Sequence, residues 1–196
     1  MKIILASSSP RRKELLQKLI HNFDIIPSNF NEDLLKNQIT DPEKLVKELS
    51  SIKAYDVFDL VKESNESLTV ISADTIVAFQ NEILGKPITE QKAYKMLEKL
   101  QGNENDVYTG MTVIMKTNEK ILEKTIVSKS SVFMKKMSKN DILEYISTKE
   151  PLDKAGAYAI QGIGQKYIES YEGNFDTIVG LDLCSLEKIL KENQII

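Results

Sequence analysis

The chain has 196 residues, a length that predicts one domain spanning residues 1–196, and 41% of its residues are hydrophobic and 28% are charged. This composition supplies enough apolar side chains for a buried core, which excludes a chain that is disordered throughout. The formal net charge is −3, from 26 Lys and Arg against 29 Asp and Glu, and this balance disfavours a protein held on duplex nucleic acid mainly by its charge.

The first third of the chain alternates predicted strands with helices that begin at a cap followed by proline. Ser9-Pro10 and Asp41-Pro42 each place an N-cap residue before a proline at the first helical position. The predicted elements are a strand over Lys2–Ala6, a helix from Ser9, a strand over Phe23–Pro27, a polar loop over Ser28–Leu34 and a helix from Pro42 to about Glu63. We expect the longer helix to bury one apolar face, made by Leu45, Leu49, Ile52, Tyr55 and Leu60.

The rest of the chain predicts further strands, capped helices and a long hairpin. Thr89 caps a helix that Gly102 ends, and Ser138 forms a capping-box pair with Asp141. The predicted elements are β-rich segments over Leu68–Ala73 and Ile76–Phe79, a turn at Asn81-Glu82, a hairpin of Val107–Met115 and Ile121–Met134 around residues 117–120, a helix from Ser138 to about Ile146, loops and short strands over Pro151–Gly180, and a helix over Leu183–Glu192. Together these elements predict an α/β fold with no internal repeat.

The sequence shows no membrane-spanning segment or signal peptide, and it has too few Cys and His residues for a metal cluster. The apolar runs are far shorter than the roughly 18 residues of a membrane-spanning helix, and the start of the chain turns polar too early for a signal peptide. The single cysteine, Cys184, fits a reducing cytoplasm. The single histidine, His21, is expected at the C-terminal end of a helix, so a zinc cluster lacks ligands and a Ser-His-Asp hydrolase is disfavoured. Any chemistry must therefore come from carboxylates, lysines, arginines, hydroxyls or a bound hard cation.

The first candidate site lies where a predicted strand leads into a helix. The hydroxyls of Ser7, Ser8 and Ser9 precede Arg11 and Arg12 in the first helical turn. Free backbone N–H groups, hydroxyl donors and guanidinium groups all favour an anion at such a position. A purely structural helix would favour Asp or Glu there, because arginines oppose the helix dipole in the first turn. An ordinary capped helix with solvated arginines is an equally weighted alternative.

The second candidate is an aspartate inside an otherwise apolar, strand-like segment. Asp74 lies in the run Ile71-Ser72-Ala73-Asp74-Thr75-Ile76-Val77. An ionised carboxylate at such a place is costly unless it is paired or bound to a metal. The residues that follow are β-rich, so a role as a helix cap fits poorly. We therefore expect a β-bulge that places Asp74 at a cleft.

Two lysines and a glutamine complete the set of candidates. Lys53 and Lys86 are individually more typical of a solvated surface, although Gly85-Lys86-Pro87 fixes the backbone from which Lys86 projects. Gln161 ends a segment rich in small residues, Asp153–Gly162, that permits close approach of a ligand. Its amide both donates and accepts hydrogen bonds, as the reading of a base edge requires. Gly-rich loops are common, so the segment alone indicates little.

Taken in order, these segments resemble the Maf family of nucleotide pyrophosphatases, also called septum-formation inhibitor homologues. The opening Ala-Ser-x-Ser-Pro-Arg-Arg and the later Asp-Lys-Ala-Gly-Ala-Tyr-x-Ile-Gln-Gly are specific motifs. The matching segments run nearly end to end: Leu5–Leu16, Ala73-Asp74-Thr75, Leu84–Pro87, Met96–Gly102, Pro151–Gly162 and Val179-Gly180-Leu181. Within the family, Pro-Arg-Arg, Ala-Asp-Thr and Ile-Gln-Gly mark the branch that acts on dTTP and UTP, and the 7-methyl-GTP branch carries other residues there.

The resemblance implies a hydrolase of phosphoric anhydrides that converts dTTP and UTP to the monophosphate and pyrophosphate. It casts Asp74 as the proton acceptor and Arg11, Thr75 and Gln161 as specificity determinants. It also places in the pocket Ser7, Ser9, Arg12, Glu32, Lys53 and Lys86. The implied fold is one elongated α/β domain, similar to ITPase-like proteins, with a mixed, strongly twisted sheet flanked by helices and a cleft between two lobes, and the implied assembly is a homodimer.

Two departures from the family pattern bear on these roles. The family often has two acidic residues where this chain has Asn31-Glu32, which affects the second metal contact. It usually has Gly-Leu-Pro where this chain has Gly180-Leu181-Asp182, which affects a turn more than the chemistry.

The residues allow a metal-assisted hydrolysis. Our hypothesis is that Asp74 and Glu32 hold Mg²⁺ or Mn²⁺, and that water attacks the α-phosphorus while lysines and the metal neutralise the leaving pyrophosphate. Nearby cations weaken a carboxylate as a proton acceptor, so we favour Asp74 as metal ligand and water orienter over Asp74 as base.

Two other functions remain as alternatives to the enzyme. The same pocket in a non-catalytic regulator of cell division would bind a nucleotide without cleaving it. A nucleic-acid-binding protein would use Arg11-Arg12 and Lys135-Lys136, which the net charge disfavours.

Overall fold

The fold is an α/β arrangement built on one mixed sheet flanked by helices, which confirms the predicted class. A computed structural model describes residues 1–64, 67–117 and 120–196. The strands are β1 (Lys2–Leu5), β2 (Asp24–Ile25), β3 (Leu68–Phe79), β4 (Glu82–Leu84), β5 (Glu104–Lys116), β6 (Ile121–Met134) and β7 (Ile168–Glu172). Their order in the sheet is β2-β1-β3-β5-β6-β7, with β4 paired to β3. The pairs of β1 with β2 and β3 are parallel, whereas the pairs β3–β4 and β6–β7 are antiparallel.

The chain forms two compact units. Unit 1 comprises Met1–Asp74, Thr109–Ser128 and Gly180–Ile196, and unit 2 comprises Thr75–Tyr108 and Lys129–Val179. The long strands β3, β5 and β6 each contribute residues to both units. The single domain over residues 1–196 therefore stays a prediction.

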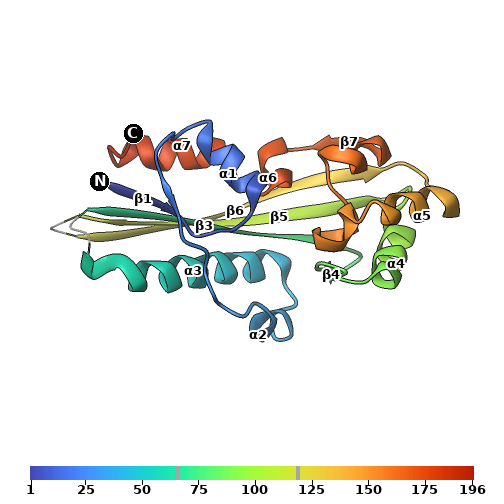
Figure 1. Cartoon of the computed structure of the whole chain (residues 1–196), viewed down its shortest axis with the longest axis horizontal. Coiled ribbons are helices and arrows are strands. Elements are labelled where there is room, and N and C mark those ends of the chain that lie inside the picture. Colours follow the sequence, from blue (N-terminus) through green and yellow to red (C-terminus); the bar gives the residue numbers. More distant parts are fainter. Residues whose placement is uncertain (65–66, 118–119) are drawn as a thin grey trace. The chain divides into compact units, whose positions relative to one another are not determined.

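Unit 1 packs helices on both faces of its part of the sheet. Its helices are α1 (Pro10–Gln17), α2 (Asp33–Lys36), α3 (Pro42–Val61) and α7 (Leu183–Glu192). Figure 1 shows α3 on one face of the strands and α1 with α7 on the other. Between α3 and the sheet lies a buried apolar cluster of Ile4, Ala6, Ala54, Val57, Phe58, Leu68, Val70 and Ile114.

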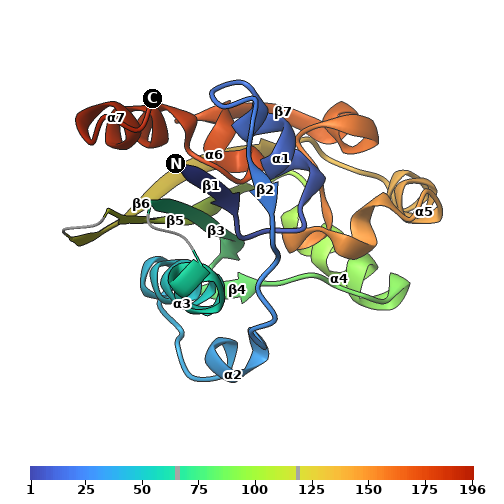
Figure 2. The same ribbon diagram turned by 60° about the vertical axis from the view of Figure 1, so that its left-hand side comes forward.

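The parallel pairing of β1 with β3 sets the position of the candidate site. Leu5 lies opposite Ile71, and the Ala6 N–H donates to the Ile71 carbonyl at 2.8 Å. The carboxyl ends of parallel strands meet at the same edge of a sheet, where α/β proteins bind ligands. Ser7 follows β1 at this edge and Asp74 lies three residues beyond Ile71 in β3, so the pairing brings residues far apart in the sequence to one edge. Figure 2 shows β1 beside β3.

Unit 2 combines three helices with a series of short turns. Its helices are α4 (Glu90–Leu100), α5 (Lys139–Ser147) and α6 (Phe175–Val179), and 3₁₀ turns cover Glu150–Asp153, Ala155–Ala157 and Gly162–Tyr167. The prediction of loops and short strands over Pro151–Gly180 was therefore wrong in part, since only β7 is a strand there. Glycines and short polar residues allow tight 3₁₀ turns that leave no clear periodic pattern in a sequence.

Local cap signals predicted the helix starts correctly. The side chains of Ser9, Asp41, Thr89 and Ser138 each accept a hydrogen bond from a backbone N–H three residues later. Ser138 and Asp141 form the predicted capping box. The prediction that His21 lies at the C-terminal end of a helix was wrong, because α1 ends at Gln17 and His21 lies beyond it.

Two expectations about unit 1 need correction. Strand β3 runs without interruption from Leu68 to Phe79, so Asp74 lies inside a strand and not between two strands. On α3, Tyr55 and Leu60 are exposed, and the buried face is made by Leu45, Val46, Leu49, Ser50, Lys53, Ala54, Val57 and Phe58. The prediction was right for Leu45 and Leu49 and wrong for Tyr55 and Leu60, because it counted only apolar side chains and passed over the buried Lys53.

The hairpin of β5 and β6 is confirmed, although residues 118 and 119 of its predicted turn lie outside the described residues. Over the parts of the chain that are described, no helix combines the length and apolarity needed to cross a membrane.

Candidate active site

In the segment between β1 and α1, serine hydroxyls accept hydrogen bonds from backbone N–H groups at the start of α1. The buried Ser7 Oγ accepts the Ser9 N–H at 3.2 Å, and the Ser9 Oγ caps α1 by accepting the Arg12 N–H at 3.5 Å. Pro10 at the first helical position lacks an N–H and needs no partner there. The Lys13 N–H donates to the Ser9 carbonyl at 3.1 Å, so the Arg11 N–H is left to carry the partial positive charge of this helix start.

Arg12 is fixed in place and is not a solvated surface residue. Its Nε donates to the Gly180 carbonyl at 2.8 Å, and its Nη1 donates to the Ser7 Oγ at 3.2 Å. Burial lowers the pKa of Arg12, and the negative charges of Asp74 and Glu32 oppose this shift. The guanidinium group therefore lies within electrostatic reach of both carboxylates. The alternative of an ordinary helix with solvated arginines is wrong for Arg12.

A lysine from α3 joins two carboxylates from different segments. Lys53 Nζ donates to Asp74 Oδ1 at 2.5 Å and to Glu32 Oε1. Lys53 is 8% exposed and Asp74 is 5% exposed, so this ion pair is buried. An ionised carboxylate at such a depth is stable only when it is paired. Lys53 is therefore the partner that permits an aspartate inside β3.

Glu32 is the third member of this cluster. Its Oε2 accepts from Lys36 Nζ at 2.5 Å, one helical turn further along the chain. Burial raises the pKa of Glu32, but the charge of Lys53 and hydrogen bonds from Lys36 and Lys53 outweigh burial and lower it to about 2. Three cationic side chains thus surround two carboxylates, and the resulting positive balance favours an additional anion.

The carboxylates offer a limited set of metal ligands. Within residues 1–64, 67–117 and 120–196, no group of three or more His, Cys, Asp or Glu side chains is arranged to hold a metal. Glu32 and Asp74 nevertheless converge on one ammonium group, Lys53 Nζ. Mg²⁺ is commonly bound by one or two carboxylates, substrate phosphates and its own waters. These two residues therefore fit a cation that binds together with a phosphate chain.

The other predicted residues have the following places. Arg11 is half-buried in α1. Thr75 is half-buried in β3, Lys86 is exposed after β4, and Gln161 is exposed immediately before a 3₁₀ turn. The last three residues belong to unit 2, and their part in the pocket stays a prediction.

Sequence reasoning missed two contributors in unit 1. Lys36 pairs with Glu32 at the i, i+4 spacing, and this spacing was a readable signal. The Gly180 carbonyl accepts from Arg12, which gives the Gly180-Leu181-Asp182 segment a role in positioning that guanidinium group. A backbone carbonyl leaves no signal in the sequence.

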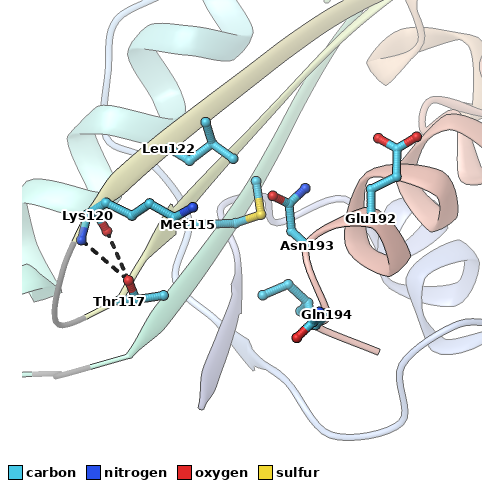
Figure 3. A pocket seen from close by; sticks show the side chains of 8 residues that line it. Met115, Thr117, Lys120, Leu122, Glu192, Asn193 and Gln194 are labelled. Atoms are coloured by element: carbon cyan, nitrogen blue, oxygen red, sulfur yellow. Dashed lines mark hydrogen bonds between the residues drawn. The ribbon is translucent and has the colours of Figure 1, made fainter.

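A separate cavity of about 270 Å³ lies in unit 1 (Figure 3). It is lined by the end of the β5–β6 hairpin and by the residues after α7, namely Met115, Thr117, Lys120, Leu122, Glu192, Asn193, Gln194 and Ile195. In Figure 3, hydrogen bonds join Thr117 to Lys120, opposite Asn193 and Gln194. None of the predicted site residues is among these lining residues.

An α/β sheet with a cationic cluster and a helix start at the carboxyl edge of its parallel strands is typical of proteins that bind phosphorylated ligands. The chain belongs to the Maf-like protein family, which matches residues 2–193.

Named relatives are similar over nearly their whole length. The chain is 47% identical to the dTTP/UTP pyrophosphatase of Caldicellulosiruptor bescii over 191 residues, which cover 97% of this chain and 94% of that protein. It is 43% identical to the dTTP/UTP pyrophosphatase of Clostridium botulinum strain Eklund 17B, covering 98% of this chain and 99% of that protein. Among solved structures, the Staphylococcus aureus Ham1 protein is similar at a TM-score of 0.46 and 14% identity, covering 99% of this chain and 100% of that one.

Proposed function

We propose that this chain is a nucleoside triphosphate pyrophosphatase that hydrolyses dTTP and UTP to the nucleoside monophosphate and pyrophosphate. The observation that carries the proposal is that the Ser7–Arg12 helix start and the Lys53–Asp74 pair occupy one edge of the sheet in unit 1. The relatives named dTTP/UTP pyrophosphatase support it, since they are similar across nearly the whole chain.

The cationic groups of this edge suit the polyphosphate. The hydroxyls of Ser7 and Ser9 and the Arg11 N–H in the first turn of α1 supply hydrogen-bond donors. Arg12 and Lys53 supply fixed positive charge, and a guanidinium group can bind a phosphate through two parallel hydrogen bonds. In the proposed enzyme, Lys86 and Arg11 add charge, while Thr75 and Gln161 contact the nucleoside.

The proposed reaction is an in-line displacement at the α-phosphorus. The oxygen of a water molecule forms a bond to this phosphorus as the bond from phosphorus to the bridging oxygen of the β-phosphate breaks, and pyrophosphate leaves with that oxygen. Asp74 orients the water by accepting a hydrogen bond from it, and the water's proton is released to solvent. A divalent cation, Mg²⁺ or Mn²⁺, would be held by Asp74 and Glu32 and would neutralise charge on the phosphate oxygens.

Pyrophosphate release from a panel of nucleoside triphosphates, with Mg²⁺ or Mn²⁺, tests the proposal. We expect release from dTTP and UTP and a kcat about 10²–10⁴-fold lower in Asp74→Asn, which keeps the size of the side chain. Asp24→Asn is the matched control, because Asp24 forms an exposed ion pair with Lys2 in the same unit. Near-normal turnover of Asp74→Asn would contradict the assigned role. Nucleotide binding without pyrophosphate release would favour the regulator instead.

The proposal includes a cytoplasmic homodimer that acts on free nucleotides and not on nucleic acid or membranes. The single cysteine supports the cytoplasm, and the net charge of −3 supports the absence of nucleic-acid binding. The homodimer is what the resemblance to the Maf family implies. Sedimentation of the purified chain and its retention on an oligonucleotide at low salt test the assembly and the absence of nucleic-acid binding.

A further inference from the structure

The segment that carries Gln161 is tied to two side chains that precede it in unit 2. Tyr145, on α5, donates through its hydroxyl to Glu150 Oε2 at 2.7 Å. The same hydroxyl accepts the Ala159 N–H at 3.1 Å. Tyr145 is fully buried, and its ring lies 5.2 Å from that of Tyr167. One end of the segment is thus bound to a side chain that has no room to move.

Glu150 binds the other end of the same segment. Its Oε1 accepts the Ile163 N–H at 3.1 Å, and its Oε2 accepts the Gly164 N–H at 2.8 Å. Together, Tyr145 and Glu150 hold backbone N–H groups on both sides of residues 160–162. Hydrogen bonds to an ionised carboxylate are stronger than those between neutral groups. The exposed Gln161 therefore projects from a backbone that is fixed before and after it.

Two glycines permit this close approach. A Cβ at Gly162 would lie 2.4 Å from Glu150 Oε1, and Gly162 has a φ of +81°. A Cβ at Gly164 would lie 2.3 Å from the Tyr145 hydroxyl oxygen. A side chain at either position would push the segment away from Tyr145 and Glu150. These contacts explain the glycines at positions 162 and 164 without any need for a ligand there.

The chemistry of the pair keeps its hydrogen-bond directions fixed. Burial, together with the hydrogen bond to Glu150 and its charge, raises the pKa of Tyr145. The phenol therefore stays protonated at neutral pH and donates to the carboxylate, which leaves its oxygen lone pairs for the Ala159 N–H.

We propose that Tyr145 and Glu150 are positioning residues that set the preference for the nucleotide base by holding Gln161. This inference rests on the proposed function and on the part that Gln161 takes in it. In this role neither Tyr145 nor Glu150 contacts the nucleotide, and both act through Gln161. A site that hydrogen-bonds its substrate discriminates well only when its donors and acceptors are held in place, because a mobile amide can adapt to the wrong base.

The test compares kcat/KM for dTTP with that for dCTP, whose base has an amino group where thymine has a carbonyl. In Tyr145→Phe we expect this ratio to fall about tenfold, about 1.4 kcal/mol, mainly through a higher KM for dTTP. Glu150→Gln should change the ratio in the same direction, because the amide replaces a carboxylate oxygen by a donor. Tyr167→Phe is the matched control: its hydroxyl donates to the Asp141 carbonyl, away from the segment.

A double-mutant cycle separates positioning from a general structural effect. If Tyr145 acts through Gln161, the double variant Tyr145→Phe/Gln161→Ala should discriminate no worse than Gln161→Ala alone. Losses of discrimination that multiply in the double variant, or an unchanged ratio in Tyr145→Phe and Glu150→Gln, would overturn the inference while leaving the proposed function intact. A wild-type chain that releases no pyrophosphate from dTTP or UTP would instead refute the proposed function, and the inference with it.

Discussion

Lys53→Met removes the ammonium group that contacts both Glu32 and Asp74 and keeps most of the side chain's apolar length. The lysine is buried, and its Nζ lies 2.5 Å from Asp74 Oδ1. After the substitution, Asp74 stays buried inside β3 without this partner. Breaking a buried ion pair by removing one member typically costs about 3–5 kcal/mol of the free energy of unfolding.

We expect the loss in the free energy of unfolding to lie at the lower end of that range, because Lys36 and Arg12 remain near the two carboxylates. Glu32 retains Lys36, and its side chain is 35% exposed, so solvent and Lys36 compensate for part of its loss. Arg12 lies within electrostatic reach of Asp74 and compensates for another part. We expect a loss of about 3 kcal/mol at pH 7, which for a chain of this size lowers Tm by roughly 6–12 °C.

Urea denaturation with and without Mg²⁺ measures both the loss and its cause. Two carboxylates without a shared ammonium group should bind the cation more tightly, so Mg²⁺ should stabilise Lys53→Met more than wild type. At about 100 times the dissociation constant the gain approaches roughly 2.7 kcal/mol. Lys47→Met, at an exposed position of α3, is the control and should stay within about 0.5 kcal/mol of wild type. If Lys53→Met is as stable as wild type, Lys53 does not stabilise the buried Asp74. If Mg²⁺ stabilises both proteins equally, Lys53 does not compete with the cation for the two carboxylates.

Two further predictions concern pH and packing. In chelator-treated protein, the pKa of about 2 for Glu32 adds stability that is present above its usual value near 4.5 and is lost as the pH falls toward 2. After allowance for solvent screening this contribution is about 1–2 kcal/mol. In urea denaturation, the free energies of unfolding of wild type and Glu32→Gln should therefore converge as the pH falls from about 4.5 toward 2. Gly110→Ala should cost about 2 kcal/mol or more, because its Cβ would lie 2.2 Å from the Val46 carbonyl oxygen on α3. Gly85→Ala, with nothing within 4 Å of the added Cβ, should be close to neutral in the same measurement.

The parts of the fold that depend on neighbouring residues could be predicted from the sequence. The caps at Ser9, Asp41, Thr89 and Ser138 were correct, because a capping bond needs only a short side chain and the N–H three residues on. The 3₁₀ turns after α5 were missed, because their close contacts depend on residues such as Tyr145 that lie outside the segment. Their form follows from packing within unit 2 rather than from local propensity.

The sequence singled out Glu32, Lys53 and Asp74 one by one, but it did not show that Lys53 pairs with both carboxylates. An aspartate in an apolar strand required a partner, yet nothing in the spacing identified Lys53, which lies 21 residues earlier on a helix. The better signal was the position of Lys53 itself, between Leu49 and Val57 on the buried face of α3. A lysine in the apolar stripe of a helix is stable only if a buried anion lies opposite, and Asp74 is that anion.

In the proposed mechanism, the contacts of Lys53 with Asp74 and Glu32 also bear on how a polyphosphate would enter the site. Lys53 shares one positive charge between two carboxylates, whereas a polyphosphate carries several negative charges close together. In the proposed enzyme, Lys53 would therefore exchange a carboxylate for a phosphate oxygen, and the released carboxylate would be available to hold the water or a cation bound to the same phosphates. The charge of the substrate would thus rearrange the buried ion pair of Lys53 and Asp74.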